Sequence, residues 1–208
     1  MNIQRPNGDT ALLTASENGN YDSVKLLVEN GASIDLAAED GNTPLISAAD
    51  TEHAAVVKLL LDHGASIDVV NNEGWTALMS ATVGGYSDVA SLLLSKGANV
   101  DTQRQNGAAA LLIACEHGRL DVVGLLLDYG ENVDMHDEEG DTPLTTATAN
   151  GHSAVVNMLV EKGAAINLAN NNGWTALMYA ATEGSLEDAS VLLKHGASVD
   201  KKLPGNKT

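Results

Sequence analysis

The chain has few of the residues that usually anchor a large core or a covalent framework. Among its 208 residues there is no phenylalanine, one cysteine and four prolines, and aromatic residues make up only 3%. Its interior must therefore be built from Leu, Ala, Val and Ile. With Cys115 as the sole cysteine no internal disulfide can form, and we expect this residue to pack as a small buried side chain.

Long hydrophobic runs are also missing. No apolar stretch approaches the roughly 20 residues that a membrane helix needs, and the polar start MNIQRPNGDT has no signal-peptide pattern. These absences predict a soluble protein of the cytoplasm that does not insert into a membrane.

Basic residues are scarce, with 11 Lys and Arg against 28 Asp and Glu and a formal net charge of −17. Phosphate backbones need the opposite sign, so nucleic acid is not expected as a partner. The balance favours a protein or peptide with a basic patch, bound by an association that weakens as salt rises. The alternative is an acidic surface that only keeps the protein in solution.

Motifs for catalysis are absent too. The sequence contains neither G-x-S-x-G nor a phosphate-binding loop. The best candidate metal ligands are Cys115, His117 and His136, but their spacing fits no standard zinc pattern. We therefore expect no catalytic residue, no metal and no cofactor.

The chain does have glycines at a fixed interval of 33 residues. One set is Gly8, Gly41, Gly74, Gly107, Gly140 and Gly173, and the other is Gly31, Gly64, Gly97, Gly130, Gly163 and Gly196. A unit of this length cannot bury its own apolar face, so its copies must stack into a solenoid.

Each unit is predicted to hold two short helices, such as 43–51 and 54–62. Columns of Leu (from Leu12 and Leu45 to Leu177) and Ala recur in register and supply the buried positions. Thr is expected to cap the first helix in five units, with Ala109 in its place in the fourth. Lysines such as Lys58, Lys96 and Lys162 fall in or just after second helices, on the outer side.

The segments GNTPLISAA from Gly41, GDTPLTTAT from Gly140 and GWTALMYAATEG from Gly173 resemble the ankyrin repeat. The resemblance implies an all-α solenoid of six repeats, elongated and gently curved, each with a helix-turn-helix and a β-hairpin loop. It also implies a non-catalytic module that binds proteins. We expect the chain to be a monomer. The expected boundaries are a single domain over 1–200 and a disordered tail over 201–208, with repeats at about 5–37, 38–70, 71–103, 104–136, 137–169 and 170–200.

Several residues depart from the family pattern. The usual His after the TPL segment is replaced by apolar residues or Thr145, so its hydrogen bonds are expected to be mostly lost. Glu52 stands where the other units have glycine between the helices, and Glu131 replaces an Ala. Ser23 and Asp188 replace a core Val in the first and last units, which predicts polar outer faces there.

Partner-binding residues are predicted on the loops and first helices, because in the family these positions face the partner. Trp75 and Trp174 follow the leading glycine and resemble interface anchors, although each ring could instead pack across its own hairpin. We hypothesise that the third to fifth repeats form the centre of an acidic groove. The predicted set is Asp40, Asn42, Glu73, Trp75, Met79, Val83, Tyr86, Glu116, Glu138, Glu139, Asp141, Trp174 and Tyr179.

Two other functions remain open from the sequence. Six copies without insertion or deletion are compatible with an engineered scaffold that has no cellular target, whereas drift at positions such as Met158 and Val191 favours natural divergence. The chain could also be the regulatory region of a larger protein.

Overall fold

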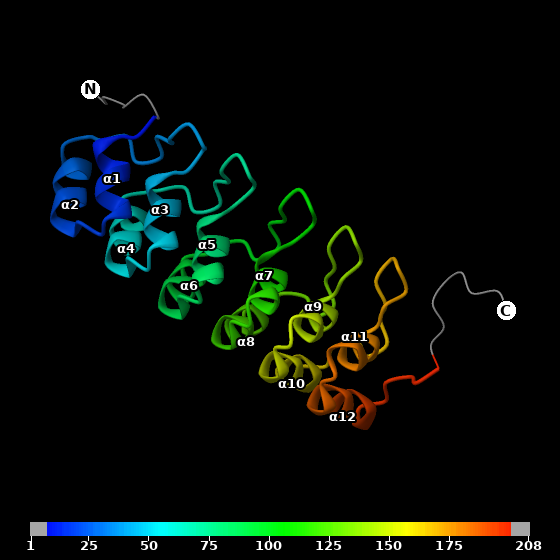
Figure 1. Cartoon of the computed structure of the whole chain (residues 1–208). Helices are drawn as coiled ribbons and strands as arrows, with labels where there is room; N and C mark the ends of the chain where they lie inside the picture. The colour runs from blue at the N-terminus through cyan, green and yellow to red at the C-terminus, as the bar shows by residue number, and fades with distance from the viewer. Residues whose placement is uncertain (1–7, 201–208) are drawn as a thin grey trace. The chain divides into compact units, whose positions relative to one another are not determined.

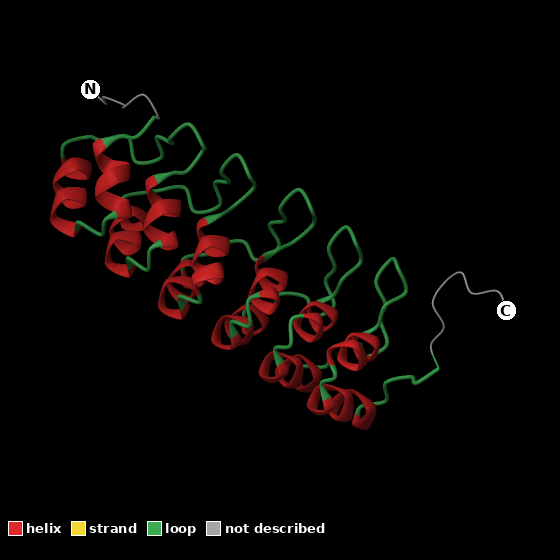
Figure 2. Cartoon of the chain, viewed as in Figure 1, coloured by secondary structure: helices red, strands yellow, loops and turns green. Residues whose placement is uncertain are grey.

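The computed structural model describes residues 8–200 and is helical throughout its regular structure (Figure 2). The helices are α1 (Ala11–Glu17), α2 (Tyr21–Glu29), α3 (Pro44–Asp50), α4 (Ala54–Asp62), α5 (Ala77–Gly84), α6 (Ser87–Ser95), α7 (Ala110–Glu116), α8 (Leu120–Asp128), α9 (Pro143–Ala149), α10 (Ser153–Glu161), α11 (Ala176–Glu183) and α12 (Leu186–Lys194). Both helices of the second repeat match the prediction to within one residue at each end. The expected tail, 201–208, lies outside the described residues.

By their internal contacts, residues fall into two compact units, Met1–Gln105 with α1 to α6 and Asn106–Thr208 with α7 to α12. Within each unit every odd-numbered helix packs on the even-numbered helix that follows it (Figure 1). Odd helices also pack on odd helices and even on even, as α1, α3 and α5 do in the first unit. Each unit is thus a two-layered stack of three repeats.

The predicted threonine caps begin five of the six first helices. Thr10, Thr43, Thr76, Thr142 and Thr175 each accept the backbone N–H three residues ahead, over 3.0 to 3.4 Å. Thr145 adds to this, because its hydroxyl accepts the Thr142 N–H at 2.7 Å and completes a capping box. The usual His position therefore still makes a polar contact in the fifth repeat.

The core lies between neighbouring helices of each unit. Leu45 and Leu78 keep only 1% and 2% of their surface exposed, and Leu12, Leu111 and Leu144 are equally buried. Leu177 in α11 is half-buried. The predicted leucine column is therefore the apolar centre of the stack in five of the six repeats.

The loops between repeats fold back on themselves without forming strands in the described chain. The N–H of Asn71 donates to the Trp75 carbonyl at 3.0 Å, and that of Asn170 donates to the Trp174 carbonyl at 3.0 Å. The pairing of Ala169 with Thr175 is an isolated antiparallel β-bridge. The hairpins are too short for a regular ladder, since few residues remain on either side of the turn.

Carboxylates tie adjacent repeats together within each unit. Asp35 accepts the N–H of Ser66 at 3.0 Å, and Asp134 accepts that of Ala165 at 2.8 Å. On the helix side, Lys96 pairs with Asp62 at 2.7 Å. Hydrogen bonds from Lys58 and then Lys96 lower the pKa of Asp62 to about 2. These pairs are exposed, so each contributes little to stability.

Asp188 does not form the polar outer face that the sequence predicted. Its side chain is 0% exposed, and its two carboxylate oxygens have no hydrogen-bond partner among residues 8–200. Leu192, one turn further along α12, is also 0% exposed, so Asp188 falls on the buried stripe of this helix. The prediction was wrong for Asp188, whereas Ser23 is exposed as expected.

Glu52 adopts the left-handed conformation that the other repeats assign to glycine. Its φ is +64°, close to the +66° of Gly19 and the +72° of Gly151. A side chain with a Cβ is strained in this region, whereas glycine is not. The turn between α3 and α4 is therefore the strained member of its set.

We predict that Glu52→Gly raises the free energy of unfolding by about 1 kcal/mol, because it relieves this strain. Urea denaturation followed by circular dichroism measures the change. Gly151→Glu is the matched control, since a Cβ there meets no atom within 4 Å and introduces only the conformational cost. A loss of stability in Glu52→Gly would contradict the account.

The fourth repeat lacks the threonine cap and uses a buried carboxylate instead. Ala109 makes no side-chain cap, while Oε1 of Glu131 accepts the Leu111 N–H at 3.2 Å. Glu131 is only 5% exposed, so this bond forms in the interior. Glu131 therefore supplies an acceptor in the first turn of α7, for the N–H one residue before the one that threonine accepts in the other repeats.

We predict that Ala109→Thr compensates for Glu131→Ala. A threonine hydroxyl restores an acceptor at the first turn, so the loss caused by Glu131→Ala should be smaller by about 1 kcal/mol when Thr is present. A double-mutant cycle of urea unfolding measures this coupling. Additive effects of the two substitutions would show that Glu131 does not act as the cap.

Candidate functional site

The first unit holds a pocket between its loops and its odd-numbered helices. Its volume is about 310 Å³, and we call it the Trp75 pocket. Helices α1, α3 and α5 supply one wall and the loops before α3 and α5 supply the other. The lining residues are Glu17, Asn42, Ile46, Ser47, Asp50, Thr51, Asn71, Glu73, Trp75, Ser80 and Val83.

The charges of the Trp75 pocket have one sign. Glu17, Asp50 and Glu73 line it and are exposed, and its lining includes no Lys, Arg or His. Glu17 and Asp50 end α1 and α3, at positions 33 residues apart. The repeat geometry therefore places two carboxylates side by side, and the loop adds a third.

Trp75 is held in place from two directions. Its backbone N–H donates to Oδ1 of Asn71 at 2.9 Å, and Oδ1 also accepts the Glu73 N–H at 3.0 Å. The guanidinium carbon of Arg104 lies 4.2 Å from the centre of the indole ring, a cation–π contact. The indole is thus an ordered, half-buried wall of the pocket.

The second unit has a counterpart pocket, 99 residues or three repeats further along the chain. It has a volume of about 240 Å³, and we call it the Tyr179 pocket. Its lining residues are Asn106, Ala108, Leu112, Glu116, Asp137, Asp141, Thr146, Ala149, Asn150 and Tyr179. Three carboxylates line it and, again, no basic side chain does.

Tyr179 packs against Trp174 of its own repeat. The ring centres are 5.1 Å apart with 36° between the planes, and Nδ2 of Asn170 donates to the tyrosine hydroxyl at 3.0 Å. The same Nδ2 donates to Oδ1 of Asp141 at 3.0 Å. Of the two roles considered for Trp174, packing within its own repeat is the one that this geometry favours.

Burial raises the pKa of Tyr179 above its usual value of 10.0, and the nearby charge of Asp141 raises it further. Because the folded-state pKa is raised, the stabilisation that depends on the neutral phenol is present below pH 10. It is lost as pH rises through the folded-state pKa.

We predict that Asp141→Asn lowers the pKa of Tyr179 toward its usual value, because the charge that opposes the phenolate is gone while burial remains. NMR titration of the tyrosine ring resonances measures this pKa. Glu183→Gln on the same helix is the control and should leave it unchanged. An unaltered pKa in Asp141→Asn would contradict the electrostatic assignment.

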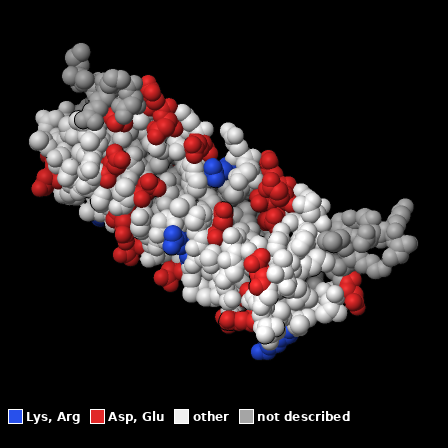
Figure 3. Space-filling view, in the orientation of Figure 1, with Lys and Arg blue, Asp and Glu red and all other residues white. Residues whose placement is uncertain are grey.

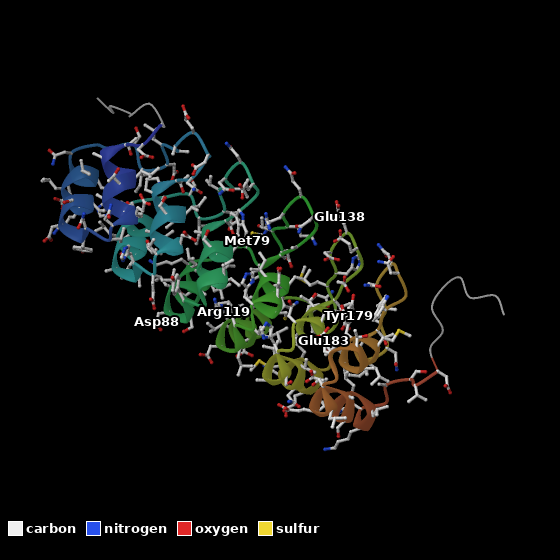
Figure 4. All side chains as sticks on the ribbon, viewed as in Figure 1. Met79, Asp88, Arg119, Glu138, Tyr179 and Glu183 are labelled. Carbon is white, nitrogen blue, oxygen red and sulfur yellow. The ribbon has the colours of Figure 1, made fainter. Side chains whose placement is uncertain are left out.

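The structure brings together about half of the predicted site residues. Asn42, Glu73, Trp75 and Val83 line the Trp75 pocket, and Glu116, Asp141 and Tyr179 line the Tyr179 pocket. Asp40, Glu138 and Glu139 are exposed on loops. Glu138, labelled in Figure 4, lines a different pocket with His136 and Leu168.

Two predicted residues do not lie where a partner could reach them through a pocket. Met79 is 1% exposed, because the third position of α5 points into the helix stack, so its prediction as a contact residue was wrong. Tyr86 precedes α6 without a side-chain capping bond, and its ring packs against Gly84, where an added Cβ would lie 2.2 to 2.5 Å from ring atoms. It lines neither the Trp75 pocket nor the Tyr179 pocket.

Sequence reasoning omitted Glu17, Asp50, Asn71 and Ser80 from the site. The column that contains Glu17, Asp50 and Glu116 was visible in the sequence, since all three end a first helix. Asn71 and Ser80 gave no such signal, because one holds the loop turn and the other is a small buried residue.

Acidic side chains are widespread on the face drawn in Figure 3, whereas Lys and Arg occur there in a few isolated places. Within residues 8–200, no three His, Cys, Asp or Glu residues are grouped so as to hold a metal ion. Cys115 is fully buried, and burial followed by the charge of Glu131 raises its pKa. No helix in the described part of the chain is long and apolar enough to span a bilayer.

Comparisons with known proteins agree on the repeat. The family model described as "Ankyrin repeats (3 copies)" matches residues 1–71, 31–104, 64–137 and 111–202. The crystal structure of the human ASB11 ankyrin repeat domain is similar, with a TM-score of 0.87 and 26% identity over 96% of this chain and 90% of that one. A comparison with curated proteins finds no match.

Proposed function

Because the chain belongs to the ankyrin-repeat family, whose members generally act as protein–protein interaction modules, we propose that it binds a protein or peptide rich in Lys and Arg. The binding surface is the loop and odd-helix side of each unit, with the Trp75 pocket and the Tyr179 pocket at its centre. No catalytic step is part of this proposal.

The observation that carries the proposal is the charge of the two pockets. They lie at equivalent repeat positions, and each is lined by carboxylates without a basic side chain. Carboxylates that served only solubility would not need to line pockets, because carboxylates anywhere on the surface provide the same repulsion between molecules. Concave acidic sites instead complement cationic side chains.

The stack of helices supports binding by holding these groups still. The pocket walls come from capped helices and from loops with several internal hydrogen bonds, so little conformational entropy is lost on association. The acidic field raises the rate of encounter with a basic partner, and added salt weakens it. Trp75 supplies the aromatic surface that binding hot spots commonly use.

We predict that the triple variant Glu17→Gln, Asp50→Asn, Glu73→Gln loses at least about tenfold in affinity for Lys- and Arg-rich peptides at low salt. A peptide array read at two salt concentrations, followed by calorimetry on the strongest peptides, measures the loss. The loss should shrink at high salt, where screening already weakens the wild-type complex.

The control variant also removes three negative charges, but from exposed positions on even-numbered helices: Asp22→Asn, Glu29→Gln, Asp88→Asn. It should weaken binding much less. Equal losses in the two variants would mean that net charge alone attracts the peptides. No binding of basic peptides by the wild-type chain would reject the proposal.

The hypothesis that Trp75 in the first unit and Glu116, Glu138, Glu139 and Asp141 in the second contribute most to binding is retained as part of the proposal. Replacing Glu138, Glu139 and Asp141 with Ser tests it through the same array. A monomeric state and a cytoplasmic location are proposed with it. The engineered scaffold and the regulatory region remain the alternatives, and a native partner identified in cells would reject the first.

A further inference from the structure

Among the positions at which the two pockets differ, one brings an aromatic ring into the second pocket and none into the first. Ser80 in α5 and Tyr179 in α11 occupy equivalent places, 99 residues apart. Around them the chain repeats the same groups, because Asn71 and Trp75 in the first unit correspond to Asn170 and Trp174 in the second. The first unit therefore repeats the asparagine and the indole that contact Tyr179, with Asn42 in the place of Asp141 and without the tyrosine.

The pocket linings agree with this reading. Asn71 and Trp75 line the Trp75 pocket, whereas their counterparts Asn170 and Trp174 are absent from the lining of the Tyr179 pocket and contact Tyr179 itself. The phenol covers them in the second unit. The Trp75 pocket is also the larger, at about 310 Å³ against about 240 Å³.

The hydrogen bonds of the two asparagines point to the kind of group that is missing. In the second unit Nδ2 of Asn170 has two acceptors, Asp141 and the Tyr179 hydroxyl. In the first unit Nδ2 of Asn71 donates to Oδ1 of Asn42 at 2.8 Å, and within the described chain no second acceptor is in range. Oδ1 of Asn71 accepts two backbone N–H groups, which fixes the orientation of the amide.

Asn71 lines the pocket, and its second amide N–H can donate to an oxygen of a ligand. Guanidinium and ammonium groups have no acceptor, so an Arg or Lys side chain cannot bond to this N–H. A phenol supplies the acceptor and a ring that packs against the indole. One side of the indole already carries Arg104, and the pocket lies beside the same ring.

We propose that the Trp75 pocket binds a tyrosine side chain of the partner, in the place that Tyr179 fills in the second unit. This inference rests on the proposed function for the rest of the contact, because Glu17, Asp50 and Glu73 then pair with basic residues that flank the tyrosine. The chain thus carries one pocket closed by its own tyrosine and one open to a tyrosine from outside.

The test is a selection from a displayed peptide library with Lys or Arg at alternate positions and any amino acid at the others. It is run in parallel on the wild-type chain and on Ser80→Tyr, which supplies the phenol internally. We expect Tyr to be enriched at a random position by the wild type and this enrichment to be lost with Ser80→Tyr. Replacing that Tyr with Ala in a selected peptide should weaken binding to the wild type about tenfold or more.

Ser80→Ala is the control and should retain the enrichment. If basic peptides are selected without Tyr, or if Ser80→Tyr selects Tyr as strongly as the wild type, the inference is wrong and the proposed function stands. If no basic peptide is selected by any of the proteins, the proposed function fails.

A second measurement needs no variant that alters the pocket. Tyramine is titrated into the wild-type chain while NMR follows the indole N–H signals, which Trp174→Phe assigns. We expect a shift of the Trp75 signal and Overhauser effects between the phenol and indole rings, with phenethylamine, which lacks the hydroxyl, binding more weakly. Equal responses to the two amines, or no contact with Trp75, would overturn the assignment of the pocket to a phenol.

Discussion

The structure depends on burying one apolar column between short helices that could not persist alone. Helices of seven to nine residues are marginal in water, and here each gains its stability from Leu and Ala pressed against the same residues of a neighbouring repeat. Because the helices of successive repeats pack in the same register, surface residues that are 33 positions apart lie at similar places in each repeat. Carboxylates, asparagines and aromatic rings at equivalent positions recur at nearly equivalent places on the surface.

Repetition also explains how the chain tolerates departures from its own pattern. The missing cap at Ala109 is met by Glu131, and Glu52 accepts a conformation that suits glycine. Asp188 lies one turn before Leu192 on α12, and these two are the buried residues of that helix. In each case the helices keep their packing, and the unfavourable free energy is confined to one residue or one turn.

The proposed binding surface arises from the same repetition. Two pockets occur at corresponding points of the two units because the same helix ends and loop turns meet there. One of their differences is the side chain of Tyr179, which lines the second pocket where the first has the small Ser80. Substitutions at these positions thus change the lining of a pocket without altering the helices beneath.

The sequence by itself determined the period, the helices, their caps and the leucine core, because these depend on local propensity and on a pattern that six copies repeat. It also indicated an acidic surface and predicted Trp75 as a partner-binding residue. Only the tertiary structure decided which carboxylates line the same pocket and that Met79 and Asp188 are buried. It also decided that Tyr179 lines the second pocket at the position that Ser80 has in the first. Those outcomes depend on contacts between residues tens of positions apart, whose directions are set by helix packing.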